Sequence, residues 1–409
     1  MSHTVLDSVA LGYQPVWNRA RQLAAVRLRV HVTHAEAVDA EHLLRVLGID
    51  WPAAAPVLIV SCDSTDLLQQ ALQCPAVRNT WLEVPGAWFE VPDLLAQLSQ
   101  ARRAGHVLLR QVDLADVRGE LITPLDARSL LRLSPEDALE ALRRSRPGAP
   151  LEAGWLMPGQ ICAGVADRHL AALCLDDAGA WGLLGWPEED VLHAHRHQPL
   201  ACSESVIQQI LQAMSDECSL DQLERLIRQD PVLVFRLLAL VNSAAFGLRR
   251  EIQSLRHAIM LLGFDSLGRW LSEQLAGADS DPELHPVRYA MVMRSRLAQH
   301  LLESGSEDDL RAEVYTTALL AELDRLLHQP LGTLINKLPL SERLFDAVLR
   351  GTGPYHPLLD VARVQGDPDI LRQLPAVCER HEMSLEHANR SLLRMLASSR
   401  DHARPVASA

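Results

Sequence analysis

The chain has 409 residues, of which 48% are hydrophobic and 22% are charged, and its formal net charge is −13. This composition excludes a largely disordered chain, and the length predicts roughly two or three domains that each bury a core. The acidic balance argues against nucleic-acid binding, which depends on clustered Lys and Arg. Lys337 is the only lysine, so chemistry that needs a lysine elsewhere in the chain is excluded.

The sequence contains neither a membrane segment nor a signal peptide. No stretch approaches the roughly 20 apolar residues that a spanning helix needs, and the first residues have no positive or apolar region. The Cys count is 7, with no Cys-x-x-Cys pair, which favours reduced, buried thiols over disulfides or a zinc site. We therefore expect a cytoplasmic protein without membrane insertion and without a cofactor.

The first part of the chain, residues 1–160, alternates between strand-like and helix-like segments. The apolar runs 57–60 and 107–109 are typical of buried parallel strands. Helices are expected from Asp93 to Arg103 and from Ser134 onward, where an N-cap serine precedes proline and two acids. This alternation predicts an α/β domain.

The rest of the chain has a different pattern. Residues 161–200 are predicted to be an ordered connector, residues 201–397 an all-α domain, and residues 398–409 a polar tail. Helix starts are expected at Ser219 and at Asp230, each with a capping residue. The remaining expected helices cover 254–263, 265–277, 287–303, 310–327, 341–350 and 384–397.

Five short segments of the N-terminal domain match a known family in scaffold residues. They are Gly12–Val16, Leu58–Ser61, Trp81–Val84, Ala104–Leu108 and Ala153–Pro158. Through these segments the domain resembles the EAL family of cyclic-di-GMP phosphodiesterases. This resemblance implies a modified α/β barrel in which the strand at Trp81–Val84 bears a metal-binding glutamate.

The catalytic residues that this resemblance implies are largely missing. Arg27 stands at the position of the signature glutamate, and Gln111-Val112 stands at the position of an Asp-Asp pair. Only Glu83 matches a metal-binding residue, with Asp113 nearby. Metal-assisted phosphodiester hydrolysis needs several carboxylates around its cations. We therefore expect a degenerate EAL-like domain in which Glu83, Asp113 and Arg27 are remnants of the site.

Six segments of the helical part carry a second resemblance. They are 221–231, 237–247, 252–263, 318–327, 338–342 and 351–354. The first three resemble the HDOD domain, an output module related to HD phosphohydrolases, and the last three resemble the C-terminal region of proteins that join a degenerate EAL-like domain to an HDOD domain. None of the 17 histidines precedes an aspartate, and Ala321-Glu322 stands where the metal-binding His-Asp pair of an HD enzyme is expected.

Two surface features of the all-α part are ambiguous. The corner formed by Asn242, Ser243, Phe246 and Gly247 is typical of a helix end, with Phe246 in the core, and alternatively lines a groove for a partner or ligand. Trp270 is typical of an amphipathic helix, or anchors an interface if it is exposed.

One further histidine-rich segment is a candidate metal site. It contains His193, His195 and His197, which an extended backbone places on one side. The proline-flanked composition favours a solvated connector instead.

These observations predict a non-catalytic bacterial signal-transduction protein that acts through protein–protein contacts of its HDOD domain with other signalling proteins. Two alternatives stay open. The first is a cyclic-di-GMP phosphodiesterase that uses Glu83 and Asp113. The second is a non-hydrolytic cyclic-di-GMP receptor in which Arg27 and Arg29 hold phosphates, since arginine forks suit phosphate groups.

Overall fold

The computed structural model describes residues 4–51, 55–114, 127–144, 158–197, 199–243, 254–303, 305–338 and 340–398. The chain divides into two compact units. The barrel unit comprises Met1–Asp190 together with Arg363–Ala409, and the helical unit comprises Val191–Ala362. The helical unit is therefore inserted, in sequence, between two parts of the barrel unit.

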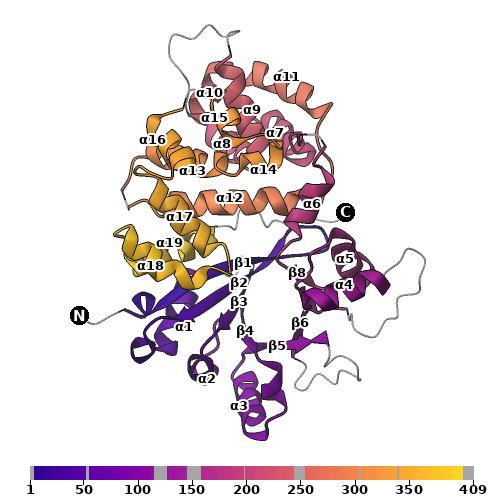
Figure 1. Ribbon diagram of the computed structural model, residues 1–409, viewed down its shortest axis with the longest axis vertical. Helices are drawn as coiled ribbons and strands as arrows, with labels where there is room; N and C mark the ends of the chain where they lie inside the picture. The colour runs from indigo at the N-terminus through magenta and orange to yellow at the C-terminus, as the bar shows by residue number, and fades with distance from the viewer. Residues whose placement is uncertain are drawn as a thin grey trace. The chain divides into compact units, whose positions relative to one another are not determined.

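Eight strands close into a barrel in the order in which they occur in the chain (Figure 1). The first strand runs antiparallel to both of its neighbours, whereas every other neighbouring pair is parallel. This topology confirms the predicted modified α/β barrel. The strands are β1 (Val9–Trp17), β2 (Leu23–Val32), β3 (Val57–Cys62), β4 (Thr80–Val84), β5 (Val107–Asp113), β6 (Arg128–Arg132), β7 (Ile161–Ala163) and β8 (Gly182–Leu184).

Helices follow most of the parallel strands and begin at conventional caps. The Asp39 side chain accepts hydrogen bonds from Glu41 N and His42 N, and Ser64 Oγ accepts one from Leu67 N. The helices of this layer are α1 (Ala40–Asp50), α2 (Thr65–Gln73), α3 (Pro92–Arg103), α4 (Pro135–Arg144), α5 (Arg168–Ala172) and α6 (Glu188–Ala194).

The predicted connector, residues 161–200, contains barrel structure. Strands β7 and β8 lie within it and close the barrel by pairing with each other and, through β8, with β1. Each of these two strands has three residues, which is too short to give a periodic hydrophobic pattern. The connector prediction is therefore wrong for this part of the segment.

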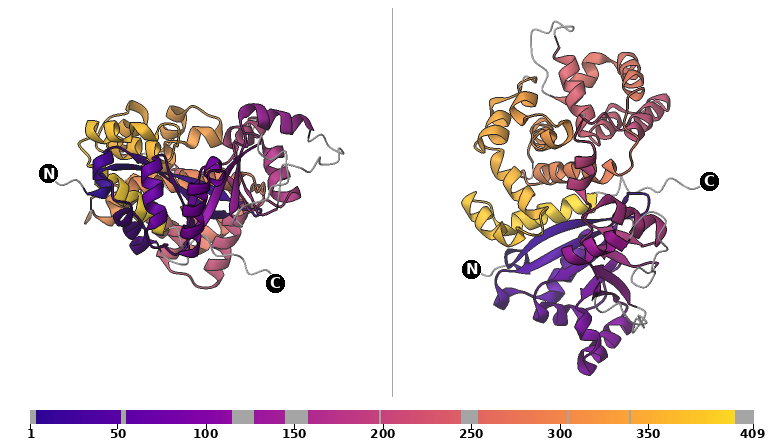
Figure 2. Two further views of the ribbon diagram at one scale, coloured as in Figure 1. Left: turned by 90° about the horizontal axis from the view of Figure 1, so that it is seen from below. Right: turned by 45° about the vertical axis from the view of Figure 1, so that its right-hand side comes forward.

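The chain returns to the barrel at its C-terminal end. Four elements make this return: α17 (His356–Gln365), the 3₁₀ helix η9 (Leu371–Gln373), α18 (Leu374–Arg380) and α19 (Leu385–Ala397). Figures 1 and 2 show α19, in yellow, beside β1, and the two elements are in contact. Residues 363–397, predicted as part of the all-α domain, thus belong to the barrel unit.

The free edge of β1 explains this return. Strand β8 pairs with β1 only at Val16 and Trp17, so the earlier backbone groups on that edge need other partners. Asn389 supplies them, because its Oδ1 accepts from Leu11 N at 3.0 Å and its Nδ2 donates to Leu6 O at 2.7 Å and Val9 O at 2.6 Å. The amide of Asn389 is completely buried.

Replacing Asn389 by Ala should destabilise the barrel unit. The substitution leaves Leu11 N, Leu6 O and Val9 O without these partners in a buried location, and an unsatisfied buried polar group costs about 1–3 kcal/mol. We expect the free energy of unfolding to fall by about 2 kcal/mol in a urea titration. Arg390→Ala, which removes an exposed ion pair with Glu386 on the same helix, is the control and should change it by less than about 0.5 kcal/mol.

The helical unit begins at Val191, ahead of the predicted all-α domain at residue 201, and it has the predicted helix starts at Ser219 and Asp230. Ser219 Oγ accepts from Gln222 N at 3.2 Å, and Asp230 Oδ1 accepts from Val232 N at 2.9 Å. Its helices are α7 (Glu204–Ser215), α8 (Leu220–Ile227), α9 (Pro231–Val241), α10 (Leu255–Leu262), α11 (Phe264–Leu275), α12 (Leu284–His300), α13 (Asp308–Leu320), α14 (Leu323–Leu327), α15 (Leu331–Ile335) and α16 (Glu342–Phe345), which continues as the π-helix η8 (Asp346–Arg350). Within the described ranges, none of the helices combines the length and apolarity that crossing a membrane demands.

Candidate functional site

A polar layer crosses the interior of the barrel towards the carboxyl ends of the parallel strands. Strand register places Gln14 beside Arg27, and Arg29 two residues further along β2, on the interior face. Below this polar layer, a cluster of apolar side chains fills the barrel interior. The cluster consists of Val16, Ala25, Ile59, Trp81, Leu109, Leu130, Ile161 and Leu184.

The centre of the polar layer is a bidentate ion pair between Arg27 and Glu83. Arg27 Nε donates to Glu83 Oε2 at 2.7 Å, and Arg27 Nη2 donates to Glu83 Oε1 at 2.5 Å. The same guanidinium donates to Ser61 Oγ and Gln14 Oε1, both at 3.1 Å. Gln111 Nε2 adds another donor to Glu83 Oε1 at 2.5 Å.

This network occupies the carboxylate that the sequence singles out as a possible metal ligand. Glu83 has 0% side-chain exposure, and its two oxygens already accept three hydrogen bonds. A cation at Glu83 would have to displace the Arg27 guanidinium. Among the described residues, neither Glu83 nor Asp113 belongs to a group of three His, Cys, Asp or Glu side chains close enough to hold a metal ion.

Asp113 lies apart from this buried pair. It is exposed at the end of β5, and its carboxylate accepts from Arg132 Nε and Nη2 at 3.0 Å each. The three sequence-predicted remnants therefore separate into a buried pair, Arg27 with Glu83, and a surface residue that pairs with Arg132. The sequence had not indicated Arg132 or the hydrogen-bonding roles of Gln14, Ser61 and Gln111.

Arg29 is the unusual cation of the barrel. It is half-buried, and in the described parts of the chain it has neither a hydrogen bond nor an ion pair. Burial lowers the pKa of Arg29, and the positive charge of Arg27 lowers it further. A half-buried guanidinium with free donors suits an anionic group, above all a phosphate.

In the helical unit, Glu322 has an arrangement similar to that of Glu83. Arg294 Nε and Nη2 donate to Glu322 Oε1 and Oε2 at 2.5 Å each, and Arg325 Nη1 donates to Oε2 at 3.3 Å. This glutamate stands where the sequence resemblance implies the second residue of an HD pair. Its carboxylate is held by two arginines.

The core of the helical unit contains a second buried ion pair. Asp230 is fully buried at the start of α9, and its Oδ1 lies 2.9 Å from Arg288 Nη1. That nitrogen makes no aligned hydrogen bond, so charge attraction holds the pair, while Nη2 donates to Ala201 O at 2.8 Å. Asp230 Oδ2 also accepts from Ser203 N at 2.5 Å.

His285 makes the stability of the helical unit depend on pH. Burial, together with the positive charge of Arg288, lowers the pKa of His285 to about 4, whereas an unfolded histidine titrates near 6.5. The unfolded chain thus binds the proton first, so this contribution to stability is present above about pH 6.5 and is lost as the pH falls towards 4, at about 1.4 kcal/mol per pH unit.

The substitution His285→Gln removes this titration. We expect the variant to lose less free energy of unfolding between pH 6.5 and pH 4 than the native chain does, as measured by urea titrations at the two pH values. An equal loss in both proteins would contradict the assignment.

The predicted interaction corner is described only in part. Asn242 ends α9, and its Nδ2 donates to Leu238 O at 2.8 Å, while Ser243 N donates to Leu240 O at 3.1 Å. Both contacts are those of a helix end. Phe246 and Gly247 lie outside the described residues, and Trp270 is half-buried on α11.

Exposed apolar side chains gather at the junction of α10 and α11. Met260, Leu261 and Phe264 are 53%, 42% and 47% exposed, and they flank the glycine between α10 and α11. Contiguous exposed apolar residues are typical of a surface that contacts another protein. We call these three residues the α10–α11 patch.

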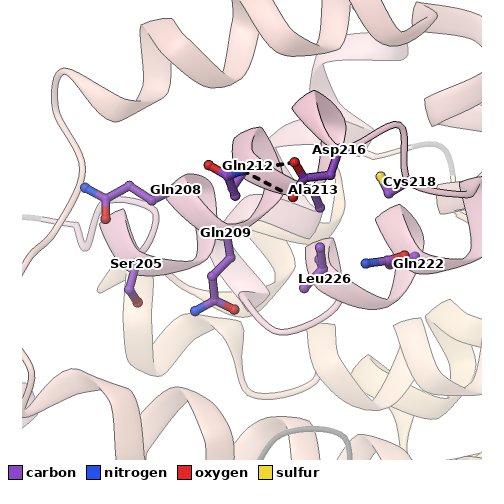
Figure 3. Close-up of a pocket in the computed structure, with 9 residues that line it drawn as sticks. All are labelled: Ser205, Gln208, Gln209, Gln212, Ala213, Asp216, Cys218, Gln222 and Leu226. Atoms are coloured by element: carbon purple, nitrogen blue, oxygen red, sulfur yellow. Dashed lines mark hydrogen bonds between the residues drawn. The ribbon is translucent and has the colours of Figure 1, made fainter. Parts of the chain in front are cut away.

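A shallow groove with a volume of about 590 Å³ lies between α7 and α8 (Figure 3). Its lining contains one charged residue, Asp216, and no Lys or Arg, so it does not suit a phosphodiester. The Gln212 amide in the groove donates to Asp216 at 3.2 Å. The lining residues are Ser205, Gln208, Gln209, Gln212, Ala213, Asp216, Cys218, Gln222 and Leu226.

The histidine-rich segment does not have the extended form that would align its rings. His193 lies in the last turn of α6, and His195 follows the helix end. His195 Nε2 lies 3.0 Å from Asp281 Oδ2, which ties this residue to the helical unit. The structure thus gives no support to a three-histidine metal site.

All seven cysteines are free thiols. Cys162, Cys174, Cys202 and Cys378 are buried, as expected, whereas Cys62, Cys74 and Cys218 are half-buried. Burial raises the pKa of Cys202 to about 12. Such a thiol is protonated at neutral pH and unreactive.

Comparison with known proteins identifies an HDOD domain in the helical part of the chain. Residues 200–330 match the HDOD domain. The chain is 26% identical over 141 residues to the uncharacterized protein YuxH of Bacillus subtilis, which is 34% of this chain and 34% of that protein. It is 27% identical over 140 residues to the cyclic di-GMP phosphodiesterase CdgJ of Vibrio cholerae, which is 34% of this chain and 32% of that protein.

These matches span about a third of each relative. Among solved structures, the MmoQ response regulator of Methylococcus capsulatus is similar with a TM-score of 0.37 and 20% identity, covering 48% of this chain and 98% of that one. A virulence factor of Campylobacter jejuni gives 0.38 and 14%, covering 52% and 99%. The predicted fold class is confirmed in its architecture, because a closed eight-strand α/β barrel precedes a helical region that contains the HDOD match.

Proposed function

We propose that this protein is a non-catalytic signalling protein that acts through contacts between its HDOD domain and other signalling proteins. The observation that carries the proposal is the state of one glutamate at each of the two expected metal sites, Glu83 and Glu322. Glu83 is held by Arg27 in the barrel, and Glu322 is held by Arg294 in the helical unit. An arginine fork at each position takes the place that a catalytic cation would need.

The contact surface that we propose is the α10–α11 patch. It lies within the HDOD match, and its three residues are more exposed than Leu349, which is 37% exposed elsewhere in the helical unit. Apolar side chains at a protein surface gain free energy when a partner removes them from water. The half-buried Trp270, further along α11 from Phe264, is available as an anchor for such a partner.

A comparative pull-down tests this proposal. The full chain is used as bait in a lysate of its source cells, beside a Leu261→Ser/Phe264→Ser variant and a Leu349→Ser control. We expect a signalling protein that the native chain and the control retain and that the patch variant loses. Equal recovery by all three baits, or recovery by none, would contradict a contact through this patch.

A second candidate function is supported by Arg29. We propose that the barrel binds cyclic-di-GMP without cleaving it, with the free guanidinium of Arg29 on a phosphate. CdgJ, to which part of this chain is similar, is a cyclic di-GMP phosphodiesterase. Arg27 is already committed to Glu83, so the receptor hypothesis rests on Arg29 rather than on both arginines.

Isothermal titration calorimetry with cyclic-di-GMP tests the receptor hypothesis. Specific binding should appear with the native chain and weaken at least about tenfold in Arg29→Met, since a charge-assisted phosphate contact is worth about 1.5–3 kcal/mol. Arg132→Met, which removes an exposed arginine paired with Asp113, is the control. No heat of binding with the native chain would remove this candidate.

A further inference from the structure

The mouth of the barrel is occupied by the chain's own C-terminal segment. Gly12 on β1 pairs with Arg29 on β2 in the antiparallel register, so position 12 faces the barrel interior beside Arg29. A Cβ at Gly12 would lie 2.8 Å from Leu371 Cδ1 and 3.1 Å from Gln365 O. The side chain of Leu371 therefore fills the space that any larger residue at position 12 would take.

Leu371 is well placed to close this space. It is 3% exposed and begins η9, whereas the next two residues, Arg372 and Gln373, are exposed. Residues 366–370 before it form turns without helix or strand. The Leu371 side chain thus packs this short element, whose other two residues are exposed, against the interior face of β1.

The flanking helices anchor the segment independently of Leu371. On one side, Gln365 Nε2 at the end of α17 donates to Leu11 O at 3.1 Å. On the other side, Asn389 of α19 makes its three buried hydrogen bonds to the β1 edge and to Leu6. Opening of η9 therefore requires the loss of the Leu371 contact and leaves both anchors in place, which is the form that local opening takes in folded proteins.

We propose that η9 is a stopper over the barrel mouth, held shut by Leu371 against Gly12, and that its displacement opens access to Arg29 and the polar layer. Arg372, the exposed residue beside Leu371, contributes positive charge near Arg29. Like charges disfavour the closed arrangement, whereas the packing of Leu371 against Gly12 favours it.

The rate at which phenylglyoxal modifies Arg29 tests the stopper, because this small reagent reacts with accessible guanidinium groups. The rate is read by peptide mass spectrometry on the full chain. Two variants weaken the same contact from opposite sides: Leu371→Ala removes the plug, and Gly12→Val displaces it with a side chain that suits a strand. Gln373→Ala, an exposed position in the same turn, is the control.

We expect both variants to increase the modification rate of Arg29 at least about tenfold, since a Leu→Ala change in a buried contact costs more than the 1.4 kcal/mol that corresponds to a factor of ten. The control should match the native chain. Equal rates in all four proteins would overturn the proposal, because the mouth would then not be closed by Leu371.

Amide hydrogen exchange separates a stopper from a core element. In Leu371→Ala and Gly12→Val, exchange should accelerate in residues 366–373 and stay unchanged in β3, β4 and β5. Acceleration throughout the barrel strands would overturn the proposal, because η9 would then be part of the cooperative core. Neither measurement depends on cyclic-di-GMP binding or on a protein partner, so its failure is distinguishable from failure of either proposed function.

Discussion

Replacing Arg27 by Met should destabilise the barrel unit by about 3–5 kcal/mol, the usual result of removing one partner from a buried ion pair. The substitution leaves the Glu83 carboxylate buried, with Gln111 as its remaining side-chain donor. The loss should appear in a urea unfolding titration that follows tryptophan fluorescence, because Trp81 lies in the layer directly below the pair.

The matched variant joins Arg27→Met with Glu83→Leu. Removing both charges leaves no unpaired carboxylate, and apolar side chains in place of a buried pair are often tolerated. We expect the double variant to be more stable than Arg27→Met alone. If the single substitution costs less than about 1 kcal/mol, or if the double variant is no better, the pair does not have the structural role that we assign to it.

Replacing Asp230 by Ala should destabilise the helical unit by a similar amount, about 3–5 kcal/mol. The change removes the N-cap of α9 and the acceptor for Ser203 N, and it leaves the buried Arg288 without its nearest carboxylate. Loss of the cap alone costs about 1 kcal/mol, so most of the effect should come from the unpaired guanidinium.

Two further variants resolve these contributions. Asp230→Asn keeps a side chain that caps well and removes the charge, so it should fall between Asp230→Ala and the native chain. Asp279 lies farther away, with Oδ2 at 3.8 Å from Arg288 Nη2, and Asp279→Ala should cost about 1 kcal/mol. The assignment is wrong if Asp279→Ala destabilises the unit as much as Asp230→Ala does.

The fold class could be predicted because its signals are long and repeated. The strands at 57–62 and 107–113 begin with the apolar runs 57–60 and 107–109, and the helices after Ser219, Asp230 and Ser254 begin where the capping residues indicate. Strands β7 and β8 could not be predicted, since three residues carry no period. Their place in the barrel depends on pairing with distant strands.

The return of the C-terminal segment could not be predicted either. Helix α19 has an ordinary amphipathic pattern, and nothing in that pattern says which surface covers its apolar face. The position of α19 is determined by the unpaired edge of β1 and by the hydrogen bonds that the buried amide of Asn389 makes to it. Both features are known only once the strand order is known.

The candidate site was predicted in its residues but not in their arrangement. The sequence identifies Arg27 and Glu83 as remnants of a metal site, and the structure shows that the two side chains form a bidentate ion pair with each other. Asp113 was predicted as a remnant of the same site, but it is exposed at the end of β5 and pairs with Arg132. Its carboxylate could ligate a metal, but it does not lie in the buried cluster that contains Glu83.

The central claim, that this barrel is non-catalytic because Arg27 holds Glu83, is tested most directly by incubating the purified chain with cyclic-di-GMP and Mg²⁺ or Mn²⁺ and measuring linear dinucleotide by chromatography. We expect no product above the level of a protein-free control. Product that forms with the native chain and disappears with Glu83→Gln would contradict the claim.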